Sequence, residues 1–175
     1  MVSAEEIKKL REITGCGIID CKKALEEAKG DFGKAQDNLR QRGLELAAKK
    51  GGRVAKEGRL ESYVHPGNKL VAVVEVNCET DFVAKSEEFT TFAKDVALHI
   101  AASSPRYIKR EEIPAEVLQA QSDVETFIKE NCLLNQPFVK DQKLTIQDYL
   151  NNLVAKIGEN IFIGRFIRYK VGEVE

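Results

Sequence analysis

The stretch VVEVNCETDFVAKSEEF, residues 73–89, decides how the chain folds, because two periodicities meet inside it. Up to Cys78, apolar side chains recur at every second position, which is typical of a strand with one buried face. From Phe89 onward they recur at helical spacing, and Ser86 is a residue type that begins helices well. The stretch therefore predicts a strand that runs into a helix through a short connection.

The segments around this stretch predict an α+β fold. Residues 59–65 and 69–77 flank Pro66-Gly67-Asn68 and are expected to pair as a hairpin. Helical patterns cover 113–131 and 145–157, a loop is expected at 136–143, and 159–171 has the pattern of a final strand. Helices, a hairpin, more helices and a strand, in that order, favour a core of antiparallel sheet packed with helices.

The first fifty residues predict three short helices. Ser3 and Glu6 form a capping box at the first helix, and Gly15 is placed to end it. A second helix is expected over 18–29. Asp31 is a suitable N-cap for a third, which should end near Gly43, with a short helical stretch after it.

A hinge follows these helices. Gly51 and Gly52 are adjacent and are followed by residues of mixed charge, which is typical of a linker. We therefore expect two domains, an N-terminal three-helix domain at 1–52 and an α+β core domain at 53–175.

Composition excludes several classes of protein. The chain has 175 residues, 43% of them hydrophobic, so a packed core is expected. The formal net charge of −1 argues against a general nucleic-acid binder. No run of 18 apolar residues predicts a membrane span, and the N-terminus lacks the apolar core of a signal peptide, so we expect a cytoplasmic protein.

The sequence offers no set of residues typical of an enzyme. There is no phosphate-binding GxxxxGK[ST] motif, and Gly15-x-Gly17 has Asp20 where a dinucleotide-binding motif needs its third glycine. The four cysteines are irregularly spaced and predict reduced thiols; a zinc site would require several of them to converge with a histidine. We expect no enzymatic activity, no cofactor and no bound metal.

A basic cluster near the hinge has two readings. It is either a solvated linker, which we favour because no aromatic residues are interleaved and two glutamates dilute it, or a nucleic-acid patch. Its members are Lys49, Lys50, Arg53, Lys56 and Arg59.

The second helix carries one apolar side chain off its core stripe. The stripe is expected to comprise Ile18, Cys21, Leu25 and Ala28. Ile19 lies about 100° away, on the face of Lys22. It is either an incidental surface residue or a contact for a partner protein.

Thr80-Asp81-Phe82-Val83 also has two readings. If the strand continued, Phe82 would lie on the core face with Thr80, and Asp81 would cap the next turn. Alternatively, the four residues project between a rigid strand and a rigid helix, where functional loops are common. A Phe buried in a partner there contributes roughly 1.5–3 kcal/mol.

Three segments together resemble the bacterial elongation factor Ts family, in a short form. They are TGCGIIDCKKALEEAKGD (14–31), NCETDFVAKSEEF (77–89) and VAKIGENI (154–161), in the family's order. The resemblance implies a guanine-nucleotide exchange factor for the GTPase elongation factor Tu. It also implies that the first domain is similar to ubiquitin-associated domains.

The family resemblance implies roles for particular residues. Ile18, Ile19 and Lys22 would contact a helix of the GTPase. Thr80, Asp81, Phe82 and Val83 would form the family's tip, which inserts near the magnesium and phosphate site so that GDP leaves. Family members often have two Met where this chain has Ile18 and Ile19, and long members carry a second core subdomain for which this chain has no room.

The final strand suggests how a missing subdomain could be replaced. Ile161, Ile163, Ile167, Tyr169 and Val171 are expected on one face, and Phe162 and Phe166 on the other. A strand apolar on both faces favours a two-fold homodimer through the core domain. The competing account is a monomer in which this strand is internal to the sheet.

Two rival functions follow from the same residues. A peptide- or ubiquitin-type binding module would use Ile19 and not the Asp-Phe tip. A small RNA-binding protein would use residues 49–59, and its binding would weaken steeply with salt.

Overall fold

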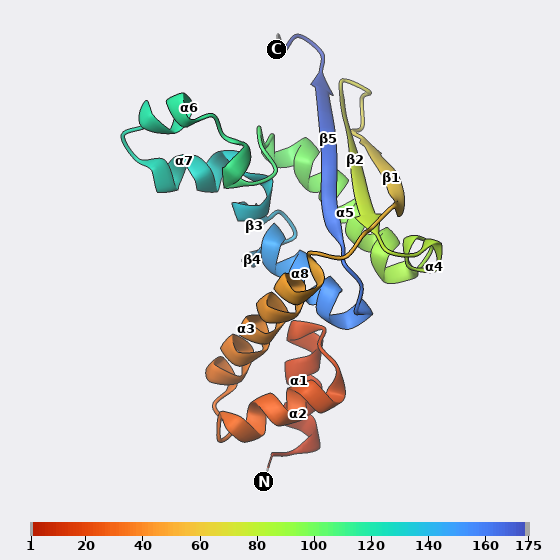
Figure 1. Ribbon diagram of the computed structural model, residues 1–175, viewed down its shortest axis with the longest axis vertical. Helices are drawn as coiled ribbons and strands as arrows, with labels where there is room; N and C mark the ends of the chain where they lie inside the picture. The colour runs from red at the N-terminus through yellow and green to blue at the C-terminus, as the bar shows by residue number, and fades with distance from the viewer. Residues whose placement is uncertain (1, 174–175) are drawn as a thin grey trace.

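The computed structural model describes residues 2–173 and confirms an α+β fold (Figure 1). Two 3-10 helices, Arg110–Glu112 and Leu133–Asn135, lie among the main elements. The strands are β1 (Glu57–Val64), β2 (Leu70–Cys78), β3 (Pro137–Phe138), β4 (Asp141–Thr145) and β5 (Phe162–Lys170). The helices are α1 (Ala4–Thr14), α2 (Ile18–Glu27), α3 (Phe32–Lys50), α4 (Asp81–Ala84), α5 (Glu87–Ser103), α6 (Ala115–Gln119), α7 (Val124–Asn131) and α8 (Ile146–Ile157).

The central sheet has the order β1-β2-β5, with both pairs antiparallel. The predicted hairpin is confirmed, with Glu61 opposite Val74. On the inner face, Ala72, Val74, Val76 and Cys78 of β2 are buried in one apolar cluster with residues of α5 and α8. The strand and the helix of the opening stretch thus build the core together, and Ser86 caps α5 as predicted.

The final strand differs from its prediction in two ways. It is an edge strand, so the expectation that it lies inside the sheet is wrong. Its faces are also not those expected, because the pairing register shifts at Gly164. Beyond this bulge, Phe166 turns toward the core, whereas Ile167 and Tyr169 are 42% and 56% exposed.

Capping residues determine where the N-terminal helices begin and end. The capping box of Ser3 and Glu6 is confirmed, Gly15 ends α1 at a φ of 68°, and Asp31 caps α3. Of the stripe predicted for the second helix, Cys21, Leu25 and the C-cap residue Ala28 are buried, in one cluster with residues of α1 and α3. The prediction that Ile18 belongs to this buried stripe is wrong, because Ile18 is 58% exposed. As the first residue of α2, it lies at the helix end, outside this cluster.

Helix α3 is longer than predicted and joins the N-terminal helices to the core. It continues through Gly43 to Lys50, because Gly43 is buried beside Asn151 of α8. Tertiary contact here overrides the helix-weakening effect of glycine, about 1 kcal/mol. Arg40 Nε also donates to Asp148 Oδ1 of α8 at 2.7 Å.

The region after α5 forms a lobe with its own small cluster around Ile113, Ile128 and Cys132. The helix predicted over 113–131 is broken into α6 and α7, with Asp123 capping the second. The loop predicted at 136–143 contains the short hairpin of β3 and β4. In Figure 1 this lobe stands to one side of the sheet.

Candidate functional site

Residues 80–83, called the tip below, begin a single helical turn at the end of β2. The strand stops at Cys78, so the reading in which it continued is wrong. Thr80, and not Asp81, is the N-cap of α4, and its hydroxyl accepts from the backbone N–H of Val83. Phe82 is 83% exposed, while Val83 packs against the core cluster. The fold therefore holds the aromatic ring in solvent. Helix α4, which carries it, lies at the side of the molecule (Figure 1).

Charge around the tip is locally paired. Lys85 Nζ lies 2.7 Å from Asp81 Oδ2, and this hydrogen bond lowers the pKa of the Asp81 carboxyl below its usual value. Beneath the tip, burial, and then the charge of Glu159, raise the pKa of the Cys78 thiol to about 11. The thiol therefore stays protonated at neutral pH, and Sγ donates to the carbonyl of Thr80 at 3.1 Å.

Sequence reasoning missed a residue that touches the tip. Glu159, in the turn between α8 and β5, accepts a hydrogen bond from the Thr80 hydroxyl at 2.7 Å. It belongs to the segment VAKIGENI that carries the family resemblance, but no periodicity or spacing singles it out. Its contact crosses 79 residues of chain, so only the folded structure brings it to Thr80.

The α2 patch, defined as Ile18, Ile19 and Lys22, is a second exposed surface. Ile19 is 69% exposed and Ile18 is 58% exposed. Lys22 Nζ lies 3.8 Å from Glu26 Oε1, one turn along the same helix. The tip and the α2 patch are not brought into contact, because α4 lies beside the sheet and α2 at the N-terminal end of the molecule (Figure 1).

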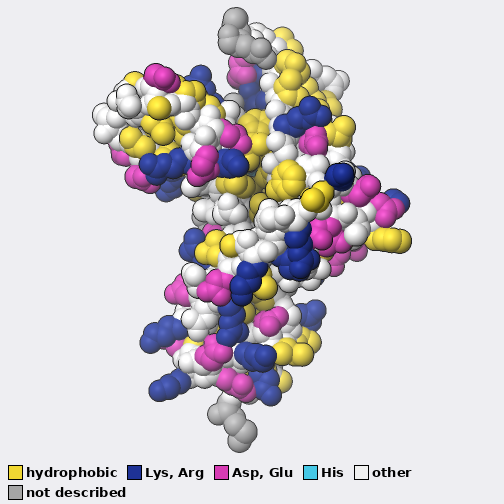
Figure 2. Space-filling model, in the orientation of Figure 1, with side chains coloured by type: hydrophobic (Ala, Val, Ile, Leu, Met, Phe, Trp, Pro, Cys, Tyr) yellow, Lys and Arg dark blue, Asp and Glu magenta, His cyan; other side chains and the backbone are white. Residues whose placement is uncertain are grey.

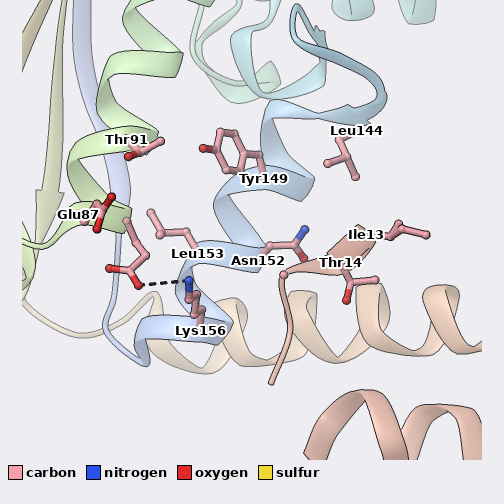
Figure 3. Close-up of a pocket in the computed structure, with 11 residues that line it drawn as sticks. Ile13, Thr14, Glu87, Thr91, Leu144, Tyr149, Asn152, Leu153 and Lys156 are labelled. Carbon is pink, nitrogen blue, oxygen red and sulfur yellow. Dashed lines mark ion pairs between the residues drawn. The ribbon is translucent and has the colours of Figure 1, made fainter. Parts of the chain in front are cut away.

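A groove of about 510 Å³ separates the end of α1 from the core (Figure 3). Ile13 and Thr14 line one side and helices α5 and α8 the other. Lys156 of α8 forms an ion pair with Glu88 at 3.2 Å on the wall near the sheet. The phenol of Tyr149 donates to Asp95 at 3.0 Å, and burial raises the pKa of that phenol.

The basic cluster is largely engaged within the chain. Lys50 Nζ donates to the carbonyl of Gly158, Arg53 lies 3.6 Å from Glu79, and Arg59 Nε lies 2.9 Å from Glu61. The two ion pairs of Arg53 and Arg59 neutralise part of the charge that a nucleic-acid patch would need.

Within residues 2–173, no three His, Cys, Asp or Glu side chains are grouped as metal ligands, and all four cysteines are free thiols. In the same range, no helix combines the length and apolar character needed to cross a bilayer.

Comparison with known proteins gives one consistent result. A sequence model of the family described as "Elongation factor TS" matches residues 2–126 and 121–173. Elongation factor Ts of Carboxydothermus hydrogenoformans is 47% identical over 196 aligned positions, which cover 99% of this chain and 90% of that protein.

Two further relatives agree. Elongation factor Ts of Caldanaerobacter subterraneus is 47% identical and that of Acetivibrio thermocellus 48%. The alignments cover 99% of this chain and, respectively, 98% and 91% of those proteins. The fold, the exposed tip and these matches over nearly the whole length lead to one conclusion: the chain belongs to the elongation factor Ts family of translation elongation factors.

Proposed function

We propose that this protein is the guanine-nucleotide exchange factor of elongation factor Tu and acts in the cytoplasm. The observation that carries the proposal is Phe82, a large apolar side chain that is 83% exposed on a helical turn anchored to the core. In this proposal Phe82 and Asp81 insert near the magnesium and phosphate site of the GTPase. Burial of the Phe82 side chain in the GTPase contributes roughly 1.5–3 kcal/mol to the binding free energy.

The physics of exchange requires no chemistry in this chain. A factor that binds the nucleotide-free GTPase more tightly than the GDP-bound form must weaken GDP binding by the same free energy. No bond is made or broken, so the proposal includes no enzymatic activity, no cofactor and no nucleotide, nucleic-acid or membrane binding by the chain itself.

In this proposal the α2 patch is a second contact with the GTPase. Ile18 and Ile19 supply exposed apolar area, and Lys22 supplies a charge at its rim. These residues would bind a helix of the GTPase and contribute affinity. The similarity of the three N-terminal helices to ubiquitin-associated domains, and the domain boundary near residue 52, belong to the same proposal.

The direct test is release of labelled GDP from elongation factor Tu. The chain at micromolar concentration should raise the GDP off-rate, and the isolated chain should bind neither GDP nor GTP. An unchanged off-rate, or GDP binding by the isolated chain, would contradict the proposal. Capture of a different protein through Ile19, or of RNA in a salt-sensitive manner, would favour the rival functions.

A homodimer through the core domain is the second part of the proposal, and the outer face of the sheet supports it. On this face Val71 and Val73 of β2 lie between exposed apolar side chains of β1 on one side and of the β5 region on the other. Figure 2 shows hydrophobic side chains gathered over the sheet. The exposed members are Leu60, Val64, Phe162, Ile167, Tyr169 and Val171, each 40% to 72% exposed. A second copy would cover this face by two-fold packing.

Sedimentation or light scattering at tens of micromolar tests the homodimer. We expect a mass near twice 19.6 kDa, and Ile167→Asp should shift it toward one chain. Leu46→Asp is a matched control, since Leu46 is 41% exposed but lies on α3. A mass of one chain that does not rise with concentration would exclude the dimer.

A further inference from the structure

The turn formed by residues 158–160, between α8 and β5, is bonded to the base of the tip. Glu159 Oε2 accepts from the backbone N–H groups of Glu79 and Thr80 at 3.0 and 3.1 Å. Its other oxygen, Oε1, accepts from the Thr80 hydroxyl at 2.7 Å. Both carboxylate oxygens are thus engaged by the two residues that directly precede α4.

The bonding is reciprocal. Glu79 Oε1 accepts from the backbone N–H of Asn160 at 2.6 Å. Each of the two segments therefore supplies a carboxylate to the backbone of the other, and hydrogen bonds to charged acceptors are stronger than neutral ones. Two chain segments about 80 residues apart are fastened here without large apolar contacts between these side chains.

The same turn also holds the linker that leaves α3. The side-chain amide of Asn160 donates to the carbonyl of Arg53 at 2.7 Å. Lys50, the last residue of α3, donates to the carbonyl of Gly158. Gly158 ends α8 at a φ of 83°, a conformation that glycine adopts without strain and that starts the turn toward the tip.

We propose that Glu159 is the positioning residue of the tip, and that turn 158–160 couples the tip to the linker from the N-terminal helices. This inference rests on the proposed exchange function and adds to it the residue that aims Phe82. The Thr80 hydroxyl transmits the constraint, because it donates to Glu159 and also accepts from Val83 N–H at 3.4 Å, beside Phe82.

The geometry explains why the hydrogen bonds to turn 158–160 matter for a side chain that inserts into a partner. Phe82 itself is held by no buried contact, since its side chain is 83% exposed. A side chain that must enter a partner in one orientation loses rate when its mount is loose, and a misplacement of about 1 Å can cost roughly 100-fold. The turn also gives the α2 patch and the tip a common attachment, through α3 and Lys50.

Glu159→Gln is the variant that tests this inference. An amide has one acceptor oxygen, so it cannot accept from Thr80 and from the two backbone N–H groups as the carboxylate does. In the full chain, amide hydrogen exchange at Glu79 and Thr80 should become about tenfold faster. This measurement needs no GTPase. Unchanged protection of both amides would overturn the inference.

The exchange assay separates positioning from binding. The maximal rate of GDP release should fall about five- to tenfold in Glu159→Gln, with a smaller change in the half-saturating concentration. Glu125→Gln is the matched control, because Glu125 forms an exposed ion pair with Arg110 in the lobe. In a Phe82→Ala background, Glu159→Gln should cause no further loss of rate, and an equal further loss would overturn the inference.

A second variant covers the case in which Glu159→Gln does not fold. Thr80→Val removes the hydroxyl from the tip side and should give the same fall in maximal rate, while Thr80→Ser should restore most of it. No fall in Thr80→Val would contradict the inference. If the wild-type chain does not accelerate GDP release, the proposed function fails, whereas the amide measurement still decides whether Glu159 holds the tip.

Discussion

The tip and the α2 patch present apolar side chains to solvent in different ways. Phe82 follows an N-cap whose hydroxyl is bonded to a carboxylate from a distant turn. Ile19 follows Gly17, an N-cap that supplies no side-chain hydrogen bond. The α2 patch is kept in place by the buried stripe beneath it, around Cys21 and Leu25.

This difference separates two contributions to one interaction. A patch on an ordinary amphipathic helix tolerates small shifts, so it is suited to supplying affinity. A single exposed ring on a fastened turn is presented from one backbone position, so it is suited to acting on the geometry of a partner. Substitutions in the two regions should therefore change different kinetic constants.

The largest effect is expected from Phe82→Ala. The maximal rate of GDP release should fall roughly ten- to hundredfold, the equivalent of losing the burial of one aromatic side chain in the partner. Stability should change by less than about 0.5 kcal/mol, because the ring is exposed. Stopped-flow GDP release and thermal unfolding check both. A loss of about 3–5 kcal/mol in stability would instead mean that the ring is a core residue.

Ile19→Asp should weaken association about tenfold and leave the maximal rate near that of wild type. The reason is that Ile19 lies on the exposed face of α2, outside the N-terminal apolar cluster. Titration calorimetry with elongation factor Tu measures the affinity. Ile13→Asp makes the same change at a site that is 50% exposed on α1 and should bind normally. Equal affinities for wild type and Ile19→Asp would make Ile19 incidental.

Asp81→Ala should lower the maximal exchange rate by a smaller factor, about two- to fivefold, since an exposed ion pair contributes little to the order of a turn. The variant loses the 2.7 Å pair with Lys85 but keeps the bonds from Glu159. The comparison of Asp81→Ala with Lys85→Ala decides the reason. A defect in both indicates that the ion pair orders the tip, and a defect only in Asp81→Ala indicates direct contact with the GTPase.

The smallest effect concerns pH and distinguishes the core from the N-terminal helices. His99 is fully buried; Nδ1 accepts from the N–H of Val139, and Nε2 donates to Gln136 at 2.9 Å. Burial lowers the pKa of this imidazole in the folded chain. The unfolded chain therefore takes up the proton first, and the free energy of unfolding falls as pH drops below about 6.5, levelling off below the folded-state pKa.

Urea unfolding between pH 5 and 8 checks this expectation. Above pH 7 the contribution of His99 should be constant. His99→Gln removes the titrating group, so the stability of that variant should vary less between pH 7 and 5 than the stability of wild type. The N-terminal helices contain no histidine, so their hydrogen-exchange protection should change little over the same range. Equal pH dependence in wild type and His99→Gln would exclude the imidazole as the cause.

Most elements of the fold were predictable because local chemistry determines them. Ser3, Asp31 and Ser86 cap their helices as their residue types predict, and the alternation in β2 matches its buried face. The helix end predicted at Gly43 was wrong because the packing of Gly43 against α8 is a tertiary contact. The helix propensity of a residue carries no information about such a contact.

The candidate site was predictable in part. The motif located residues 80–83, but the pattern alone could not decide whether Phe82 lies in the core or in solvent. That choice depends on where β2 ends, and a single residue of register exchanges the two faces. Glu159 was beyond prediction, because no spacing rule relates a carboxylate to a hydroxyl 79 residues earlier.

The bulge at Gly164 has a consequence for how this family can change during evolution. Ile163 pairs with Val76 and Arg165 with Glu75, so Gly164 is the extra residue and has no partner of its own on β2. Deleting it would leave a regular ladder in which every position from Arg165 to Lys170 keeps its present face. The length of this strand should therefore vary during evolution at the bulge, where one residue more or less leaves the inner and outer faces unchanged.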